Sequence, residues 1–461
     1  MFKTIFYREV LDNFLTRRFY TVLILCLIII PLGIYISTKD YQSRLQSYQE
    51  SIRLYDESHK TTQDTSIRGA EGYRPPSSLS FLSLGLEIIL PNVAESQTRK
   101  AGSEIELGLN NNQSTDNLYS TLHGPLDIVF IVSVVMTFFA IVFAYGSISG
   151  EREQGTLKQI LSNSVSRSQI ILAKLCANYL VLVMPFLISL MISLLIFHED
   201  SQLLLGRNGA WSHIFFGIVF SLLIIGAFFN LGVMISALTK HAVSTIVILL
   251  LCWVFLYGIY PRLSVLLSEL IYPVKSQQLI SQEKKQIRME NEKELETQVN
   301  KLVDSEQYSP EKQEAMREDY RSRLTNRLIK YDQEIWNKRN TQMMIMTNLS
   351  RLSPVSCFVR PLAEISLTGW LQYQEFTAGV SRFQQELNKQ IIAKEKVEEH
   401  KDGTVSIRGL SSSADVPKFN ILSVSNDVLI NNILTDLILL IIYNLLFFTG
   451  AFVFFLKYDP R

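Results

Sequence analysis

Residues 126–148 read LDIVFIVSVVMTFFAIVFAYGSI, and this stretch decides the fold. Its one charged residue, Asp127, stands second, and almost everything after it is apolar. A helix of about 20 apolar residues is needed to cross the hydrocarbon core of a bilayer. Lipid offers no partners for backbone N–H and C=O groups, and a helix satisfies them within one segment. The stretch is therefore predicted to be a transmembrane helix.

Five further blocks of the chain have the same apolar character. They lie at residues 20–36, 170–197, 213–238, 243–267 and 428–456. Hydrophobic residues make up 48% of the 461 residues and charged residues 19%, which alone would also suit a soluble protein with a large core. Because the apolar residues come in long blocks, we predict instead an all-α polytopic membrane protein with six transmembrane helices.

The polar loops between these blocks give the orientation. Six spans place both chain ends on one side of the membrane, and the short loops on that side are rich in lysine and arginine. These residues are Arg17, Arg18, Arg152, Lys158, Arg167, Lys240, Lys457 and Arg461. The positive-inside rule makes that side cytoplasmic. The net charge of +1 gives no general attraction to nucleic acid, so no nucleic-acid partner is expected.

The chain then divides into eight predicted segments. The first places Phe2, Ile5, Phe6, Val10 and Phe14 on one helical stripe, which favours a helix lying in the membrane interface. In chain order the segments are a cytoplasmic interfacial helix (1–18), a first transmembrane helix (19–37), a first extracytoplasmic segment (38–125), a second transmembrane helix (126–148), a cytoplasmic coupling helix loop (149–168), the third to fifth transmembrane helices (169–267), a second extracytoplasmic segment with a helical hairpin (268–427), and the sixth transmembrane helix with a cytoplasmic tail (428–461).

The first extracytoplasmic segment is predicted to be largely helical. It begins with a heptad-like stripe, which indicates that the first span continues outward as a stalk. The stripe consists of Tyr41, Leu45, Tyr48, Ile52 and Tyr55. Residues 79–90 are apolar, bounded by prolines and too short to span, so we expect a helix docked on the spans or resting on the outer leaflet. Residues 99–120 are rich in Asn, Ser and Gly and are expected to form a flexible loop.

The second extracytoplasmic segment contains the pattern of a helical hairpin. Its outgoing arm carries Ile287, Leu295, Val299 and Leu302. Ser309, Pro310 and Glu311 then give a helix start signal. The return arm carries apolar residues at steps of three and four, namely Met316, Tyr320, Leu324, Leu328, Tyr331 and Ile335. Two interpretations stay open, a projection that binds a partner or closes a dimer, and a hairpin that pairs only with itself.

Motifs for catalysis are absent from the sequence. No Gly-Lys-Ser/Thr phosphate-binding loop occurs, so the chain is not expected to hydrolyse ATP by itself. The six histidines are scattered and no Cys/His cluster has the spacing of a metal site. No Ser/His/Asp constellation can be argued from residue order either. We therefore expect neither an enzyme nor a cofactor in this chain.

The informative stretch is the loop after the second span. Glu151 and Glu153 stand just outside the bilayer, and Gly155 allows a sharp turn. Thr156 can then cap a short helix over residues 157–161. The apolar face of that helix would consist of Leu157, Ile160 and Leu161. Such a helix either docks in a groove on a cytoplasmic partner or rests in the membrane interface.

Residues 150–174, GEREQGTLKQILSNSVSRSQIILAK, closely resemble a loop of the permease subunits of ATP-binding-cassette transporters, in the bacterial export class. In that family the Gly-Glu-x-Glu-x-Gly-Thr-Leu run forms the coupling helix that contacts the ATPase subunit. The resemblance gives this role to Glu151, Glu153, Gly155, Thr156 and Leu157, with Arg167 and Lys174 following. Residues 77–91 and 349–376 resemble a sub-family with two large external segments; Thr368-Gly369 stands where that sub-family has a Gly-Thr pair, and no role is carried over to it.

The resemblance implies a permease driven by a separate ATP-binding-cassette ATPase, which would hold the ATP and Mg. It also implies a second permease copy or homologue and a bacterial inner membrane, with both termini cytoplasmic. A periplasmic partner is a further candidate. Two other functions remain open, a force transmitter that moves no substrate and a membrane scaffold or sensor. The sequence does not identify a substrate.

Four polar residues inside the spans complete the predictions. Asp436 lies a few residues within the last apolar block, which is longer than a span requires, so we expect this carboxylate at the outer interface. Asn178, Asn230 and Asn444 are predicted to form hydrogen bonds between helices rather than to bind a substrate.

Overall fold

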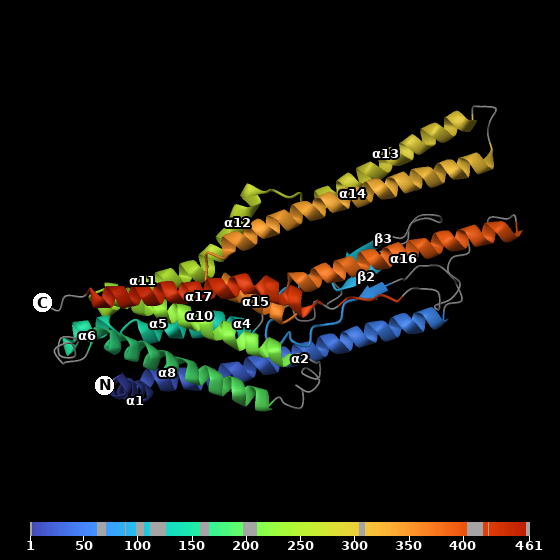
Figure 1. Cartoon of the computed structure of the whole chain (residues 1–461). Coiled ribbons are helices and arrows are strands. Elements are labelled where there is room, and N and C mark those ends of the chain that lie inside the picture. Colours follow the sequence, from blue (N-terminus) through green and yellow to red (C-terminus); the bar gives the residue numbers. More distant parts are fainter. Residues whose placement is uncertain are drawn as a thin grey trace. The chain divides into compact units, whose positions relative to one another are not determined.

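The computed structural model describes residues 2–61, 71–87, 89–97, 106–110, 126–156, 166–196, 210–303, 309–402, 418–422 and 424–457. They fall into two compact units. Unit 1 comprises Met1–Tyr257 and Pro354–Arg461, and unit 2 comprises Gly258–Ser353. Figure 1 gives the order of the helices and strands along the chain.

Six helical stretches among the described residues are long and apolar enough to cross a membrane, which confirms the predicted all-α polytopic fold. They are Arg17–Glu57, Ile128–Glu153, Arg167–Ile196, Trp211–Leu238, Ala242–Ile271 and Asn426–Leu456. Two of them contain a π-helical segment. The second span runs through α4 (Ile128–Phe130), η2 (Ile131–Met136), α5 (Thr137–Ala144) and α6 (Ser149–Glu153), and the fifth through α11 (Ala242–Val254), η3 (Phe255–Ile259) and α12 (Tyr260–Ile271).

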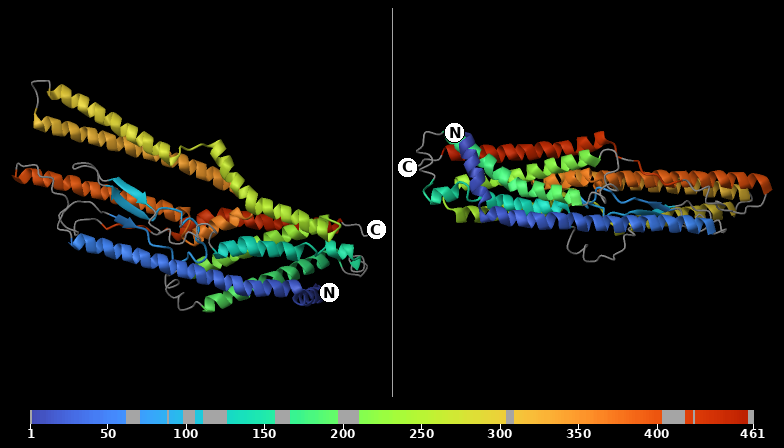
Figure 2. Two further views of the ribbon diagram at one scale, coloured as in Figure 1. Left: turned by 180° about the vertical axis from the view of Figure 1, so that it is seen from behind. Right: turned by 90° about the horizontal axis from the view of Figure 1, so that it is seen from below.

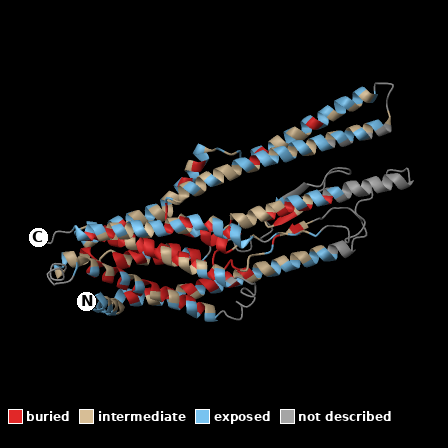
Figure 3. Ribbon diagram, viewed as in Figure 1, coloured by how far each residue is buried: buried red, intermediate tan, exposed pale blue. Residues whose placement is uncertain are grey.

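The core of unit 1 is centred on α10 (Ala210–Leu238), which is apolar on all sides. A helix of that kind has to be surrounded by other elements. It packs against α17 (Asn426–Leu456), α5, α8 (Arg167–Ile196), α11 and α15 (Ser356–Ile365). Phe220, Phe228 and Phe229 of α10 are fully buried, and Figure 3 shows the buried residues gathered in this bundle.

The chain begins with two helices, α1 (Phe2–Phe14) and α2 (Arg17–Thr61). Helix α1 packs against α8. A short turn separates it from α2, where the backbone N–H of Phe19 donates to the carbonyl of Thr16. Helix α2 then runs for 45 residues without interruption, so the predicted continuation of the first span into a stalk is confirmed. Helix α1 and the last turn of α17 lie at the same end of the unit, here called the terminal end (Figure 2).

The outer part of unit 1 contains a small sheet that the sequence analysis did not anticipate. Strands β1 (Glu71–Tyr73), β2 (Val93–Gln97) and β3 (Glu106–Asn110) pair antiparallel in that order. Ala94 of β2 packs in an apolar cluster with α16 (Trp370–Asp402). The prediction of a flexible loop over residues 99–120 is therefore wrong for β3, and the rest of that loop lies outside the described residues.

The apolar stretch at residues 79–90 docks on the spans as predicted, but as turns rather than as a helix. Leu79, Phe81 and Leu82 belong to the same core as the spans. Two backbone N–H groups of this stretch bond to residues far away in the chain. That of Leu84 donates to the carboxylate of Asp127 at 3.0 Å, and that of Leu86 donates to the carbonyl of Thr368 at 2.9 Å. A helix would instead require donors paired with carbonyls four residues earlier.

Unit 2 contains the predicted hairpin. It consists of α13 (Gln277–Val303) and α14 (Pro310–Ser350), and α14 begins after Ser309 with Pro310 in its first turn, as predicted. The two helices contact each other along their length. Lys284 pairs with Asp332 at 2.7 Å, and the Nδ2 of Asn291 donates to the carbonyl of Tyr320 at 3.3 Å. The hairpin is therefore paired with itself, and a role in binding a partner stays a prediction.

Candidate functional site

The glutamates predicted to couple the chain to an ATPase lie on the short helix α6. Its last residues end in a turn at Gly155, whose φ of +74° favours glycine because it lies in the left-handed region. The hydroxyl of Thr156 donates to the carbonyl of Glu151 at 3.3 Å across this turn. Leu157, Ile160 and Leu161 lie outside the described residues, so the predicted helix over 157–161 and its apolar face remain predictions.

Two consecutive residues of α6 hold the turn between the fourth and fifth spans. Arg152 donates to the carbonyl of Thr239 at 2.6 Å and to that of Ala237 at 3.2 Å, at the end of α10. Glu153 accepts a hydrogen bond from the backbone N–H of Ala242 at 3.0 Å, at the start of α11. A cation at a helix C-terminus and an anion at a helix N-terminus both interact favourably with the helix dipole. Arg152 and Glu153 thus fix the end of one span and the start of the next.

A buried group of hydroxyls joins the same helices. Ser236 of α10 accepts hydrogen bonds from the backbone N–H groups of Ile148 and Ser149, at 3.2 and 3.0 Å. The hydroxyl of Thr245 on α11 donates to that of Ser149 at 3.0 Å. Since these side chains are buried, each bond replaces one that water would otherwise have made.

The third charged residue of α6 faces the other side of the bundle. The carboxylate of Glu151 lies 2.5 Å from the ammonium of Lys174 on α8, and Glu9 of α1 lies 2.6 Å from the same ammonium. The side chain of Lys174 is only 8% exposed. One turn farther along the two helices, Asn13 of α1 donates to Asn178 of α8 at 2.6 Å. Lys174 thus joins α6 and α1 to the third span.

These contacts together form what is here called the α6 cluster. Its members are Glu9, Ser149, Glu151, Arg152, Glu153, Lys174, Ser236, Thr239, Ala242 and Thr245. The sequence pointed to Glu151, Glu153 and Lys174, but not to Glu9 or to the hydroxyl groups of Ser149, Ser236 and Thr245. Glu9 could have been found only from its four-residue spacing to Asn13, which places both on one face of α1.

A second polar group lies at the other end of the bundle, where α15 meets α17. Asp436 of α17 is fully buried and forms an ion pair with Arg360 of α15. The guanidinium also donates to Asn432, at 3.3 Å to its side-chain oxygen and at 3.1 Å to its carbonyl. The sequence analysis expected Asp436 at the outer interface of the membrane. The structure adds that the carboxylate is buried within the protein and paired.

One helical turn after Arg360 on the same helix, Glu364 caps the start of the next helix, α16. Its carboxylate accepts hydrogen bonds from the backbone N–H groups of Trp370 at 3.1 Å and Leu371 at 3.3 Å, at the start of α16. Burial raises the pKa of Glu364, and the two N–H donors and Arg360 act in the opposite direction. A Cβ on Gly369 would lie 2.4 Å from this carboxylate, so any other residue there would displace the Glu364 side chain.

The turn between α15 and α16 binds two further elements. The hydroxyl of Thr368 donates to the carbonyl of Ser83 at 3.0 Å, which ties the turn to the docked stretch at residues 79–90. The Nδ1 of His213, at the start of α10, lies 2.7 Å from the carbonyl of Ile365. Residues 356–371, here called the α15 corner, therefore contact the fourth and sixth spans, α16 and the docked stretch.

The spans also contain the predicted hydrogen bonds between helices. The Nδ2 of Asn230 on α10 lies 3.1 Å from the side-chain oxygen of Asn444 on α17, and Asn178 is bonded to Asn13. The prediction that these three asparagines form hydrogen bonds between helices is confirmed.

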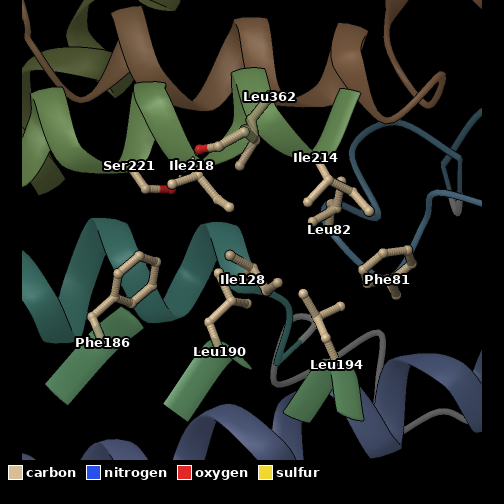
Figure 4. A pocket seen from close by; sticks show the side chains of 11 residues that line it. Phe81, Leu82, Ile128, Phe186, Leu190, Leu194, Ile214, Ile218, Ser221 and Leu362 are labelled. Carbon is tan, nitrogen blue, oxygen red and sulfur yellow. Dashed lines mark hydrogen bonds between the residues drawn. The ribbon is translucent and has the colours of Figure 1, made fainter. Parts of the chain in front are cut away.

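Among the described residues, the docked stretch meets the spans at a small cavity. Figure 4 shows apolar side chains, among them Phe81, Phe186 and Ile214, converging on a cavity of about 10 Å³. That volume holds about one water molecule. Among the described residues no group of three or more His, Cys, Asp or Glu side chains could hold a metal ion.

Comparisons with known proteins agree with this architecture. No curated protein matches the chain. The family model of the ABC-2 family transporter proteins matches residues 4–459, which is nearly the whole chain. Its extent covers the six spans, the α6 cluster and the α15 corner. The chain therefore belongs to the ABC-2 transporter family and is a multi-pass permease component of an ABC transporter.

Proposed function

We propose that this chain is a permease subunit that docks a separate ATPase through residues 149–168 and pairs with a second copy or a homologue. The observation that carries the proposal is the α6 cluster. Helix α6 directly precedes the loop expected to receive the ATPase. It is bonded to α8, to the end of α10 and to the start of α11, and Lys174 of α8 is bonded in turn to α1. A displacement of that loop would thus act on several spans at once.

In this proposal the ATP and Mg stay in the partner, and the chain supplies only the mechanical response. Closure of the ATPases would displace residues 157–165 and with them α6. Arg152 and Glu153 would carry the displacement to the α10–α11 turn, and Glu151 to α8 and α1 through Lys174. The result is a rigid-body switch between two states of the bundle.

The proposal includes an orientation. The terminal end would face the cytoplasm of a bacterial inner membrane, and the α15 corner and the hairpin would face outward. The basic residues of the loops support this orientation by the positive-inside rule. Reporter fusions after Thr156 and within residues 285–340 test it, and an external position of Thr156 would overturn it.

The docking role is tested by purification with the ATPase. The purified chain alone should hydrolyse no ATP, whereas the complex should. Replacing Leu157 and Leu161 by glutamine should release the ATPase from the complex. The matched control replaces Leu263 and Leu270, two exposed leucines of α12, by glutamine. Full retention of the ATPase by the first variant would contradict docking at this loop.

Coupling is tested separately at Glu153. Glu153→Lys should keep the chain inserted and the ATPase bound, because the residue is exposed and bonded to only one neighbouring helix start. It should abolish coupled transport, because a cation then faces the N-terminus of α11. Glu269→Lys, at an exposed position of α12, is the control. Normal transport by Glu153→Lys would refute the coupling role.

A second candidate function is a force transmitter that acts on an external partner and moves no substrate. The self-paired hairpin and the 45-residue helix α2 favour it, because both are extended helical elements beyond what a span requires. Replacing residues 285–340 by a short linker discriminates between the two. A transmitter should lose all function, whereas an exporter should retain part of it. A scaffold or sensor would show no ATPase in the purified complex.

A further inference from the structure

A gain in stability does not by itself explain why the carboxylate of Asp436 is buried. It is fully buried in α17, in a stretch long and apolar enough to span a membrane. Removing a carboxylate and a guanidinium from water costs several kcal/mol each, and an apolar pair of similar volume is often as stable or more so. An ionisable residue in such a span is therefore a candidate for a functional role.

The partner of Asp436 bridges two turns of α17. Arg360 contacts both Asp436 and Asn432, so its planar guanidinium holds the helix at two points. Its Nε is buried and finds no acceptor among the described residues. A buried donor left unsatisfied requires an explanation, and a contact that changes between two states provides one.

Arg360 is connected onward through the α15 corner. Glu364 lies four residues later on the same helix and caps the start of α16. Thr368 then binds the docked stretch through Ser83, and the docked stretch is bonded to Asp127 before the second span. The ion pair therefore stands between α17 and a continuous set of bonds that leads to the outer elements.

Helix α17 is held at its other end as well. Its last carbonyl, that of Leu456, accepts a hydrogen bond from Arg167 at 3.1 Å. Arg167 is the first residue of α8 and directly follows the loop proposed to dock the ATPase. The 31 residues of α17 correspond to a rod about 46 Å long. An arginine thus holds this rod near each end, one beside the docking loop and one at the α15 corner.

We infer that the Arg360–Asp436 ion pair is the contact through which the sixth span moves the α15 corner during the ATP-driven cycle. The inference rests on the proposed function and adds to it a pair of positioning residues. The pair does not touch a substrate. It makes the outer elements follow α17, so its removal uncouples their rearrangement from ATP hydrolysis.

The test measures the distance between α16 and α17 in the complex with its ATPase, with and without ATP. Probes are attached to non-natural amino acids at Ser381 and Asn431, which are both exposed. The variant Arg360→Met/Asp436→Leu replaces the pair by apolar side chains and avoids an unpaired buried charge. The control Arg53→Met/Glu50→Leu removes an exposed ion pair of 2.6 Å in the same way.

The apolar variant should assemble and hydrolyse ATP as the control does. Its ATP-dependent change in the distance between Ser381 and Asn431, which is small in the unmodified chain because α16 follows α17, should grow about fivefold or more. An unchanged distance change in the apolar variant would overturn the inference and leave the pair a structural contact. If that variant does not assemble, Asp436→Asn, which retains an acceptor for Arg360, is judged by the same criterion. Failure of the unmodified chain to bind an ATPase would instead refute the proposed function.

Discussion

At the terminal end of the bundle, charged side chains of the short helix α6 bind three longer helices, α8, α10 and α11, whereas at the α15 corner backbone groups provide most of the bonds. In the α6 cluster Lys174 binds two carboxylates, and Arg152 and Glu153 bind helix ends. At the α15 corner the partners of Glu364 and Thr368 are main-chain groups. The difference predicts that removing a charge has its largest effect in the α6 cluster, whereas a change of shape matters more at the α15 corner.

The largest effect is expected from removing the shared cation of the α6 cluster. Lys174→Met leaves the carboxylates of Glu9 and Glu151 close together without their counter-ion. Breaking a buried ion pair by removing one partner destabilises a protein by about 3–5 kcal/mol. Thermal unfolding of the purified chain in detergent should show this loss, and Lys240→Met, at an exposed lysine, should not. Equal stability of both variants would show that the α6 cluster does not depend on charge.

At the α15 corner the expected effect is smaller and comes from shape rather than from charge. In Gly369→Ala the new methyl group would lie 2.4 Å from the carboxylate of Glu364. The carboxylate must shift and lose its hydrogen bonds to the start of α16, at about 1–3 kcal/mol. Gly146→Ala is the control, because the nearest atom there is at 3.8 Å. Thermal unfolding measures the difference in stability between the two variants. If Gly369→Ala is as stable as the control, the α15 corner can shift to accommodate the methyl group.

The next prediction concerns the turn that ends α6, where the backbone of Gly155 has a positive φ. Gly155→Ala introduces no clash, since nothing lies within 4 Å, but its φ of +74° costs a non-glycine residue about 1–2 kcal/mol. Gly150→Ala, five residues earlier and equally open, lies within α6 and should be neutral or stabilising. The two variants are compared by thermal unfolding and by retention of the ATPase. A neutral Gly155→Ala would indicate a different backbone at this turn.

The smallest effect is a dependence on pH at the α15 corner. Burial raises the pKa of Glu364, so the folded protein binds its proton more tightly than the unfolded chain does. Stability from this residue should then decline as pH rises above the usual glutamate value of about 4.3, up to the raised pKa. Glu364→Gln does not titrate, so the difference in unfolding temperature between the two proteins should shrink or reverse with rising pH. Parallel curves would contradict the shift.

Much of the fold could be predicted because each membrane span corresponds to a long apolar block of the sequence. The six spans, the stalk of α2 and the hairpin all follow from patterns within one segment. The docking of residues 79–90 was predicted, but their turn conformation and strand β3 were not, because their backbone groups bond to residues far away in the chain. The spacing of apolar residues within one segment does not reveal hydrogen-bond partners in another segment.

The candidate site divides in the same way. The motif around Glu151 is local and was found from the sequence, whereas Glu9 and Lys174 meet it only after the chain has folded. Asp436 stood out as a carboxylate in an apolar block, but its partner Arg360 lies 76 residues earlier. Gly369 carried no local signal either, since its requirement comes from the position of the Glu364 carboxylate.

The unbroken length of α2 has a geometric consequence. Its 45 residues extend over about 68 Å, so a stiff helix that tilts by about 5° within the bilayer displaces its far tip by about 6 Å. Small angular changes among packed spans are thereby magnified at the outer extremity without any change in the helix itself. A tilt of α2 too small to open a passage through the membrane would still displace the tip of the helix, far above the membrane surface.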